Sequence, residues 1–145
     1  MAGKTCVIDS SIAIKWFVEE HDSDEAVELL KRLNEKQVNV IVPDLILYEI
    51  ANSLRWNSKF NQDDVEEALR DIAGFGFQIL APTSELINSA IVIAYATKCT
   101  VYDAVFIALA KMYGCALVTA DQKLTSLMGS LTLKEALKLI YTKSN

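Results

Sequence analysis

The chain has 145 residues, of which 52% are hydrophobic, and its mean hydropathy is +0.23. This length can bury a sizeable core, and we expect one domain over residues 1–145. The 19 acidic residues outnumber the 14 basic ones, and the net charge of −5 argues against a broad basic surface for nucleic acid. No apolar run reaches the roughly 18 residues of a membrane helix, and the N-terminus leads straight into a predicted strand. We therefore expect a cytoplasmic protein without membrane contact.

Strands and helices alternate along the chain. The buried strands are predicted at residues 5–8, 39–42, 77–80 and 116–119. The helices are predicted from residue 12, from residue 23, and over 45–60, 62–73, 84–98, 102–113 and 133–140. This alternation favours an α/β fold, a three-layer α/β/α arrangement around a central parallel sheet of about four to five strands.

Acidic residues follow two of the predicted strands. Asp9 ends the first strand directly, and Asp121 lies two residues beyond the fourth. The carboxyl ends of parallel strands are where open α/β sheets place their ligands. Asp9 or a following serine could instead simply cap the next helix, and Asp121 could be an acid favoured at a helix start by the helix dipole.

Two further acids lie within apolar helical stretches. Asp103 begins a helix that is apolar nearly all round, and Glu49 shares one helix face with Asn52, Ser53 and Trp56. Taken singly, Asp103 could be an acid favoured at a helix start, and Glu49 a solvated position. Taken together, buried carboxylates without basic partners repel one another, and a divalent cation would resolve this. Oxygen ligands alone favour Mg²⁺ or Mn²⁺ over zinc.

At these residues the chain resembles the PIN-domain family, and within it the small stand-alone toxins of the VapC type. The resemblance covers essentially the whole chain and rests on four stretches in order: Val7-Ile8-Asp9-Ser10-Ser11, Tyr48-Glu49-Ile50-Ala51-Asn52, Tyr102-Asp103-Ala104-Val105-Phe106-Ile107-Ala108-Leu109-Ala110 and Leu117-Val118-Thr119-Ala120-Asp121-Gln122-Lys123-Leu124.

The resemblance implies an endoribonuclease, dependent on Mg²⁺ or Mn²⁺, that hydrolyses RNA through a metal-activated water. By position, its catalytic and metal-binding acids would be Asp9, Glu49, Asp103 and Asp121. Ser10, Asn52 and Thr119 match positions that support the site by hydrogen bonding. The resemblance also implies a homodimer and a cognate antitoxin that blocks the acidic pocket with a basic side chain. Gln122 and Lys123 follow Asp121 where some relatives carry a further acid. The sequence is therefore compatible with a site for one metal ion or for two.

Substrate contacts are expected from basic and aromatic residues near these stretches. The candidates for phosphate contacts are Lys15, Arg55 and Lys123, and those for base stacking are Trp16 and Trp56. His21 is the single histidine, and it lies in an acidic turn, so an acid–base pair of histidines is excluded.

Other functions fit less well. A phosphoaspartate receiver would need paired acids after the first strand, and a haloacid-dehalogenase-type phosphatase would need Asp-x-Asp, whereas the chain has Asp9-Ser10-Ser11. No nucleotide-binding glycine motif or Gly-x-Ser-x-Gly occurs. Two alternatives remain: a non-catalytic PIN-like module that binds RNA or protein, and a housekeeping RNA-processing nuclease.

Overall fold

The protein is built on a five-stranded parallel sheet with the strand order β3-β2-β1-β4-β5. The computed structural model describes residues 4–127 and 130–142. The strands are β1 (Lys4–Ile8), β2 (Val38–Pro43), β3 (Gln78–Leu80), β4 (Ala116–Val118) and β5 (Ser130–Leu131). All neighbouring strands pair in parallel, with Cys6 of β1 opposite Val40 on one side and Ala116 on the other. The predicted α/β fold with a parallel sheet is confirmed.

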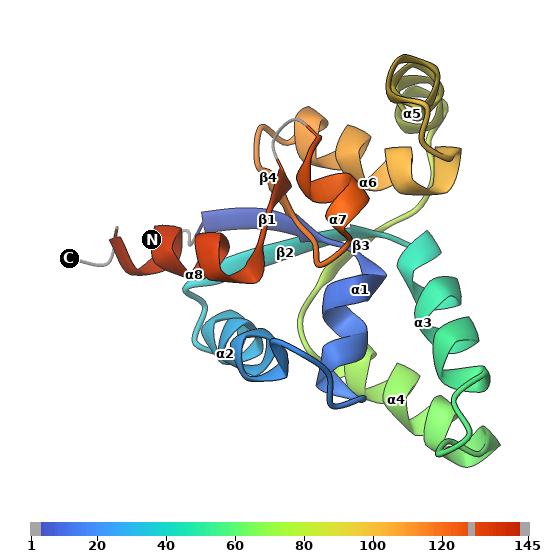
Figure 1. Ribbon diagram of the computed structural model, residues 1–145, viewed down its shortest axis with the longest axis vertical. Coiled ribbons are helices and arrows are strands. Elements are labelled where there is room, and N and C mark those ends of the chain that lie inside the picture. Colours follow the sequence, from blue (N-terminus) through green and yellow to red (C-terminus); the bar gives the residue numbers. More distant parts are fainter. Residues whose placement is uncertain (1–3, 128–129, 143–145) are drawn as a thin grey trace.

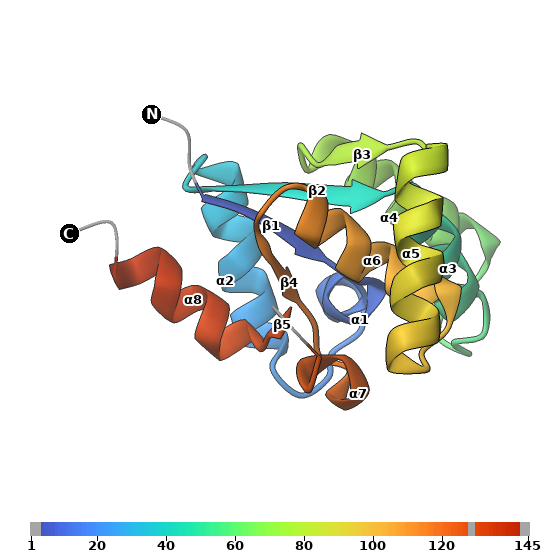
Figure 2. The same cartoon turned by 90° about the horizontal axis from the view of Figure 1, so that it is seen from above.

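Helices cover both faces of this sheet. They are α1 (Ser10–Ala13), the 3₁₀ turn η1 (Ile14–Trp16), α2 (Ser23–Asn34), α3 (Leu45–Arg55), α4 (Gln62–Gly74), α5 (Ser84–Thr97), α6 (Val101–Met112), α7 (Gln122–Thr125) and α8 (Leu133–Thr142). Helix α6 lies against β1, β2 and β4, while α2 and α8 pack together on the opposite face (Figures 1 and 2). Helix α5 packs on the outside of α6 and stands away from the sheet (Figure 1).

The chain changes direction across the sheet at β1. It first builds β2 and β3 on one side of β1, and then crosses over to add β4 and β5 on the other. Such a switch point leaves a crevice beyond the carboxyl ends of the two strands that flank it, here β1 and β4. Asp9 follows β1 and Thr119 follows β4, so both residues lie at this crevice.

The position of helix α6 between the sheet and α5 explains why its sequence is apolar on every side. Seven consecutive residues, Ala104 to Ala110, are buried because the sheet lies on one side of the helix and α5 on the other. Gly114 then takes a positive φ of 60°, a left-handed conformation that favours glycine and ends the helix before β4.

The structure differs from the prediction at the start of the first helix and at the end of α3, and it contains two short elements that were not predicted. The first helix begins at Ser10 rather than residue 12, because the Asp9 side chain caps it. Helix α3 ends at Arg55 rather than residue 60, because the Asn57 side chain accepts a hydrogen bond from the backbone of Lys59 at 2.9 Å and forms a turn. The short elements α7 and β5 were not predicted, since neither is long enough to show a periodic pattern.

Within the described residues, no single helix is long and apolar enough to cross a membrane. Helices α5 and α6 reach that length and composition only as a pair, and they meet at a bend of 114°.

Candidate active site

Asp9 is held by hydroxyl groups from two parts of the chain. Its carboxylate is only 5% exposed. The backbone and hydroxyl of Ser11 donate to Oδ1 at 3.1 and 2.5 Å, and the hydroxyl of Thr119 donates to Oδ2 at 2.5 Å. Burial raises the pKa of Asp9, the nearby Asp121 carboxylate adds to that rise, and the Ser11 and Thr119 hydrogen bonds oppose it.

The same two hydroxyls also fix the turn that carries Asp121. Ser11 Oγ accepts a hydrogen bond from the backbone of Ala120 at 2.9 Å, and Thr119 Oγ1 accepts one from the backbone of Asp121 at 3.0 Å. Each hydroxyl therefore donates to Asp9 and accepts from the segment after β4. We call Ser11 and Thr119 the hydroxyl clamp. It couples the position of Asp121 to the orientation of Asp9.

Glu49 enters the site from α3. The Ser10 hydroxyl hydrogen-bonds its carboxyl group, yet Oε1 is buried and has no hydrogen-bonding partner among the described residues. Burial raises the pKa of Glu49 to about 7, and the Asp9 and Asp103 carboxylates push it in the same direction. A buried carboxylate oxygen without a donor is costly unless a ligand supplies the missing interaction.

Asp103 and Asp121 lie at the starts of α6 and α7. Asp121 caps α7 by accepting from the backbone of Lys123 at 2.9 Å. Asp103 lies in the first turn of α6, where Thr100 is the N-cap. Burial raises the pKa of Asp103, the Asp121 carboxylate raises it further, and Thr100 and Lys123 lower it. Asp9 and Asp121 therefore both cap helices, and capping does not compete with a role in the site.

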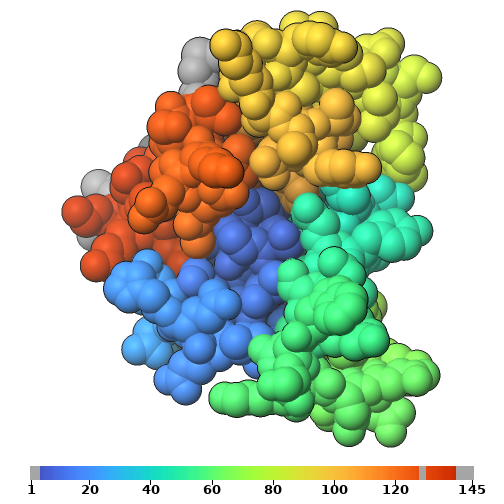
Figure 3. Space-filling view, turned by 45° about the vertical axis from the view of Figure 1, so that its right-hand side comes forward, coloured from blue at the N-terminus to red at the C-terminus, as the bar shows by residue number. Residues whose placement is uncertain are grey.

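The four acids gather around one hollow. Asp9 interacts electrostatically with Asp121 and Glu49, and Asp103 with Glu49 and Asp121. Figure 3 shows the hollow, where residues of β1 and α1 form the floor between α7, α6 and α3. We call this the acidic cleft, defined by Asp9, Glu49, Asp103 and Asp121.

The geometry of the acidic cleft suits a hydrated cation. No three acidic, histidine or cysteine side chains within residues 4–127 and 130–142 are placed to ligate one ion directly. Mg²⁺ commonly keeps several waters and takes only one or two carboxylates from the protein. The unpartnered oxygen of Glu49 and the unneutralised charge of four carboxylates fit such an ion. The residues present therefore match a divalent cation held partly through water.

Sequence reasoning missed one member of the hydroxyl clamp. Ser11 was not predicted to support the site, although Thr119 and Ser10 were, and all three make hydrogen bonds to site carboxylates. The available signal was its place two residues after Asp9, where a side chain can bond back to a capping carboxylate.

Asn52, which was predicted to support the site, is exposed on α3, one turn beyond Glu49.

Two of the predicted substrate contacts have their polar groups bonded within the fold. Lys15 is only 8% exposed, and its ammonium donates to the His21 carbonyl at 2.6 Å and to Glu20 at 3.3 Å. Trp16 is half-buried and packs against the core: its indole donates to the Ala26 carbonyl at 2.7 Å, and its ring packs against Phe75 with 5.6 Å between ring centroids.

The other predicted substrate residues stay accessible. Lys123 is exposed and acts on Asp103 electrostatically. Arg55 is exposed as well, and its guanidinium lies 4.8 Å from the ring centroid of Trp56, which is 74% exposed.

The fold and the acidic cleft together define an α/β protein with a carboxylate site at the switch point of its sheet. The PIN domain model matches residues 6–128. Over 123 residues the chain is 30% identical to Ribonuclease VapC3 of Pyrobaculum aerophilum. The matched region covers 81% of this chain and 90% of that protein. The chain belongs to the PIN-domain family.

Solved structures share the fold. The crystal structure of PAE2754 from Pyrobaculum aerophilum matches with a TM-score of 0.71 and 19% identity, covering 99% of this chain and 98% of that one. A toxin–antitoxin complex from Klebsiella pneumoniae contains a chain that matches with a TM-score of 0.69 and 16% identity, covering 88% and 97%. The predicted PIN-like architecture is confirmed.

The raised pKa of Glu49 predicts how stability depends on pH in excess chelator. Between the ordinary value of 4.5 and about 7, the folded protein keeps a proton that the unfolded chain has released, so stability falls as pH rises through this window. Glu49→Gln removes this loss and should raise the free energy of unfolding at pH 8 by on the order of 1 kcal/mol, because water screens a half-buried group. The melting temperature at pH 8 should rise accordingly. The gain should vanish near pH 4.

Thermal melts of the two proteins across this range measure the effect, with Glu66→Gln as the control because Glu66 is exposed on α4. A Glu49→Gln variant that is less stable than the wild type at pH 8 would contradict the predicted repulsion.

Proposed function

We propose that the protein is a metal-dependent endoribonuclease, a hydrolase that uses Mg²⁺ or Mn²⁺ in the acidic cleft. The observation that carries the proposal is the meeting of four carboxylates from separate segments around the unpartnered Oε1 of Glu49. Similarity to a protein named as a ribonuclease supports RNA as the substrate. An RNA substrate in turn favours the cytoplasm as the location.

Different side chains have different roles in the proposed reaction. Asp9, Glu49, Asp103 and Asp121 would hold the cation, directly or through water. A divalent cation bound there lowers the pKa of water and offsets charge on a phosphodiester. The hydroxyl clamp keeps Asp9 in one orientation. Lys123 and Arg55 are the proposed contacts to substrate phosphates, and Trp56 is the proposed stacking residue at the end of α3.

The biological role we propose is that of the toxin in a toxin–antitoxin pair. The Klebsiella pneumoniae structure with the same fold is a toxin–antitoxin complex, which supports a protein antitoxin as a partner of this chain. An acidic cleft also suits a basic side chain from such a partner. The alternatives are a housekeeping RNA-processing nuclease and a non-catalytic binding module.

We further propose a homodimer formed through α5 with a contribution from α3. Ile91, Val92 and Tyr95 of α5 are 39, 69 and 85% exposed, which leaves an apolar strip on a helix whose main packing partner among the described elements is α6. Light scattering should give a dimer mass at micromolar concentration, and Tyr95→Asp should shift it to the monomer. A monomer mass for the wild type across this range would refute the dimer.

The proposal predicts that cleavage requires both the cation and the acidic cleft. Chelation should abolish cleavage of RNA, and Mg²⁺ or Mn²⁺ should restore it. Asp103→Asn keeps the shape of the side chain but removes a charge, so we expect activity to fall at least about 100-fold while the fold remains intact. Asp63→Asn, on the exposed first turn of α4, is the matched control and should cleave normally.

Full cleavage in excess chelator would refute the metal-dependent mechanism.

Induced expression of the wild type and of Asp103→Asn in cells distinguishes the toxin from the housekeeping nuclease. Growth arrest with RNA degradation from the wild type alone supports the toxin, whereas normal growth favours the housekeeping nuclease.

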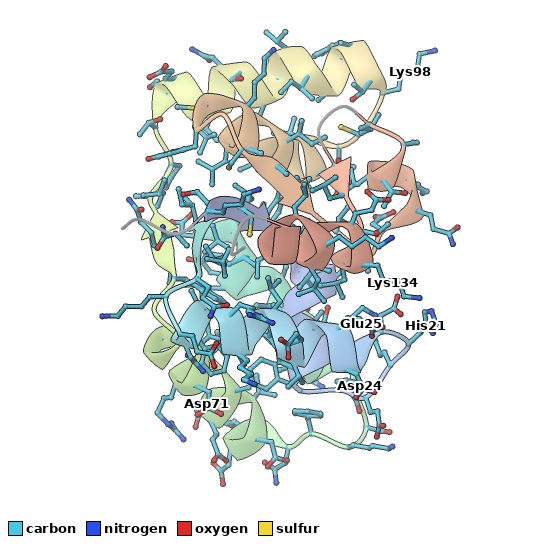
Figure 4. All side chains as sticks on the ribbon, turned by 90° about the vertical axis from the view of Figure 1, so that its left-hand side faces the viewer. His21, Asp24, Glu25, Asp71, Lys98 and Lys134 are labelled. Carbon is cyan, nitrogen blue, oxygen red and sulfur yellow. The ribbon has the colours of Figure 1, made fainter. Side chains whose placement is uncertain are left out.

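The proposal also predicts the ends of the fragments, a 5′-phosphate and a 3′-hydroxyl. Cleavage through the neighbouring 2′-hydroxyl normally needs a general base and a general acid. His21 is the only histidine, its side chain is 92% exposed, and it projects from the loop before α2 (Figure 4). Attack by water should leave the phosphate on the downstream fragment, and one 2′-deoxy substitution should slow cleavage without preventing it.

A kinase that needs a free 5′-hydroxyl tests this outcome. Efficient labelling of the downstream fragment without phosphatase treatment would show that the mechanism is wrong.

A further inference from the structure

A pocket lies at the corner where α3 meets α4, and none of the four acids of the cleft lines it. Its volume is about 570 Å³, which is within the range of ligand-binding pockets. Two apolar side chains form one part of its wall, and polar side chains from the end of α3 and the start of α4 form the rest. The lining residues are Arg55, Phe60, Asn61, Gln62, Val65 and Glu66. We call this the corner pocket.

Packing within the chain does not account for the groups at the corner pocket. Arg55 is exposed and forms no ion pair with any residue of 4–127 or 130–142. Its guanidinium lies 4.8 Å from the ring centroid of Trp56, which is 74% exposed although tryptophan is usually largely buried. The carboxylate of Glu66 accepts a hydrogen bond from the Gln62 amide at 3.1 Å. The pocket therefore offers a cation, an accessible aromatic ring, and donors and acceptors of hydrogen bonds.

Helix α3 connects the corner pocket to the acidic cleft. It runs from the sheet to the corner with α4 (Figure 1). Trp56 follows Glu49 by seven residues, or two helical turns, so both lie on one face of α3 about 10 Å apart along its axis. Asn52 and Ser53, between them on this face, are exposed and uncharged. Since α3 carries no carboxylate between Glu49 and Arg55, a polyanion that leaves the cleft can follow this face.

We propose that the corner pocket binds one nucleobase of the RNA substrate, about three nucleotides away from the phosphodiester that is cut. The separation follows from the length of α3, because three nucleotides at about 3.4 Å each cover the distance from Glu49 to Trp56. The proposal rests on the ribonuclease function above and adds a site of substrate recognition outside the acidic cleft.

The lining of the corner pocket suits a nucleotide. The guanidinium of Arg55 contacts the phosphate, and the exposed ring of Trp56 at the mouth of the pocket stacks on the base. Phe60 and Val65 form the apolar wall against which the base lies. The Glu66 carboxylate accepts a hydrogen bond from an amino group on the edge of the base, so the pocket favours bases that carry one.

Removal of single bases from the substrate tests the proposal. An RNA that the wild type cuts is prepared with one abasic nucleotide at each position in turn. Its binding to the Asp9→Asn variant, which should not cut it, is followed by fluorescence anisotropy. An abasic nucleotide about three positions from the cut should weaken binding about 5- to 100-fold, because the stacking of one base is lost.

Variants of the corner pocket assign this loss to the protein side. In the Asp9→Asn parent, Trp56→Ala and Phe60→Ala should each weaken binding of the intact RNA, and the abasic nucleotide should then cause little further loss. Trp56 is exposed, so its replacement leaves the core intact, and a thermal melt checks the fold of Phe60→Ala. Tyr113→Ala is the matched control: Tyr113 is 47% exposed beyond the end of α6, and this variant should keep the full dependence on the base.

The proposal is overturned if no base at this distance from the cut affects binding, or if its effect persists unchanged in Trp56→Ala. A change in molecular mass of Trp56→Ala with unaltered RNA affinity would assign this surface to a protein interface and would also overturn it. In each case, cleavage by the wild type shows that the ribonuclease function stands. A wild type that neither cuts nor binds RNA refutes that function itself.

Discussion

The site depends on the hydrogen bonds between Asp9 and the hydroxyl clamp. Thr119 lies 110 residues after Asp9 in the chain, yet its hydroxyl is bonded to that carboxylate, and the Ser11 hydroxyl is bonded to the other oxygen. Since each hydroxyl also accepts from the backbone of the β4–α7 turn, loss of either would release both Asp9 and the segment that carries Asp121. A single pair of small polar side chains thus joins the ends of β1 and β4.

The sheet topology brings the ends of β1 and β4 together, and the charges gathered there favour binding of a cation. Because β1 and β4 are parallel neighbours on either side of the switch point, their carboxyl ends meet at one crevice. The pKa values of Asp9, Glu49 and Asp103 are all raised, which means that burial and mutual repulsion oppose their charged forms. The fold therefore maintains a site that a divalent cation would stabilise.

Local sequence patterns were enough for most of the fold but only for part of the site. The apolar run ended by Asp9 and the helix predicted over 62–73 are encoded within a few residues, and the structure has β1 (Lys4–Ile8) and α4 (Gln62–Gly74) at nearly the predicted positions. Ser11 acts through contacts to β4, and Lys15 is buried by the loop that brings Glu20 to it. Such contacts depend on residues that are brought together only by folding, and periodicity does not report them.

Binding of Mn²⁺ to the metal-free protein, followed by electron paramagnetic resonance, tests the central claim most directly. We predict saturable binding by the wild type that tightens as pH rises through about 7, because the Glu49 carboxyl must lose its proton to take part. The Asp9→Asn variant should lose most of this binding, and Asp63→Asn, altered outside the cleft, should keep it. Undiminished binding in Asp9→Asn, or none in the wild type, would contradict a cation site built on the clamped carboxylate.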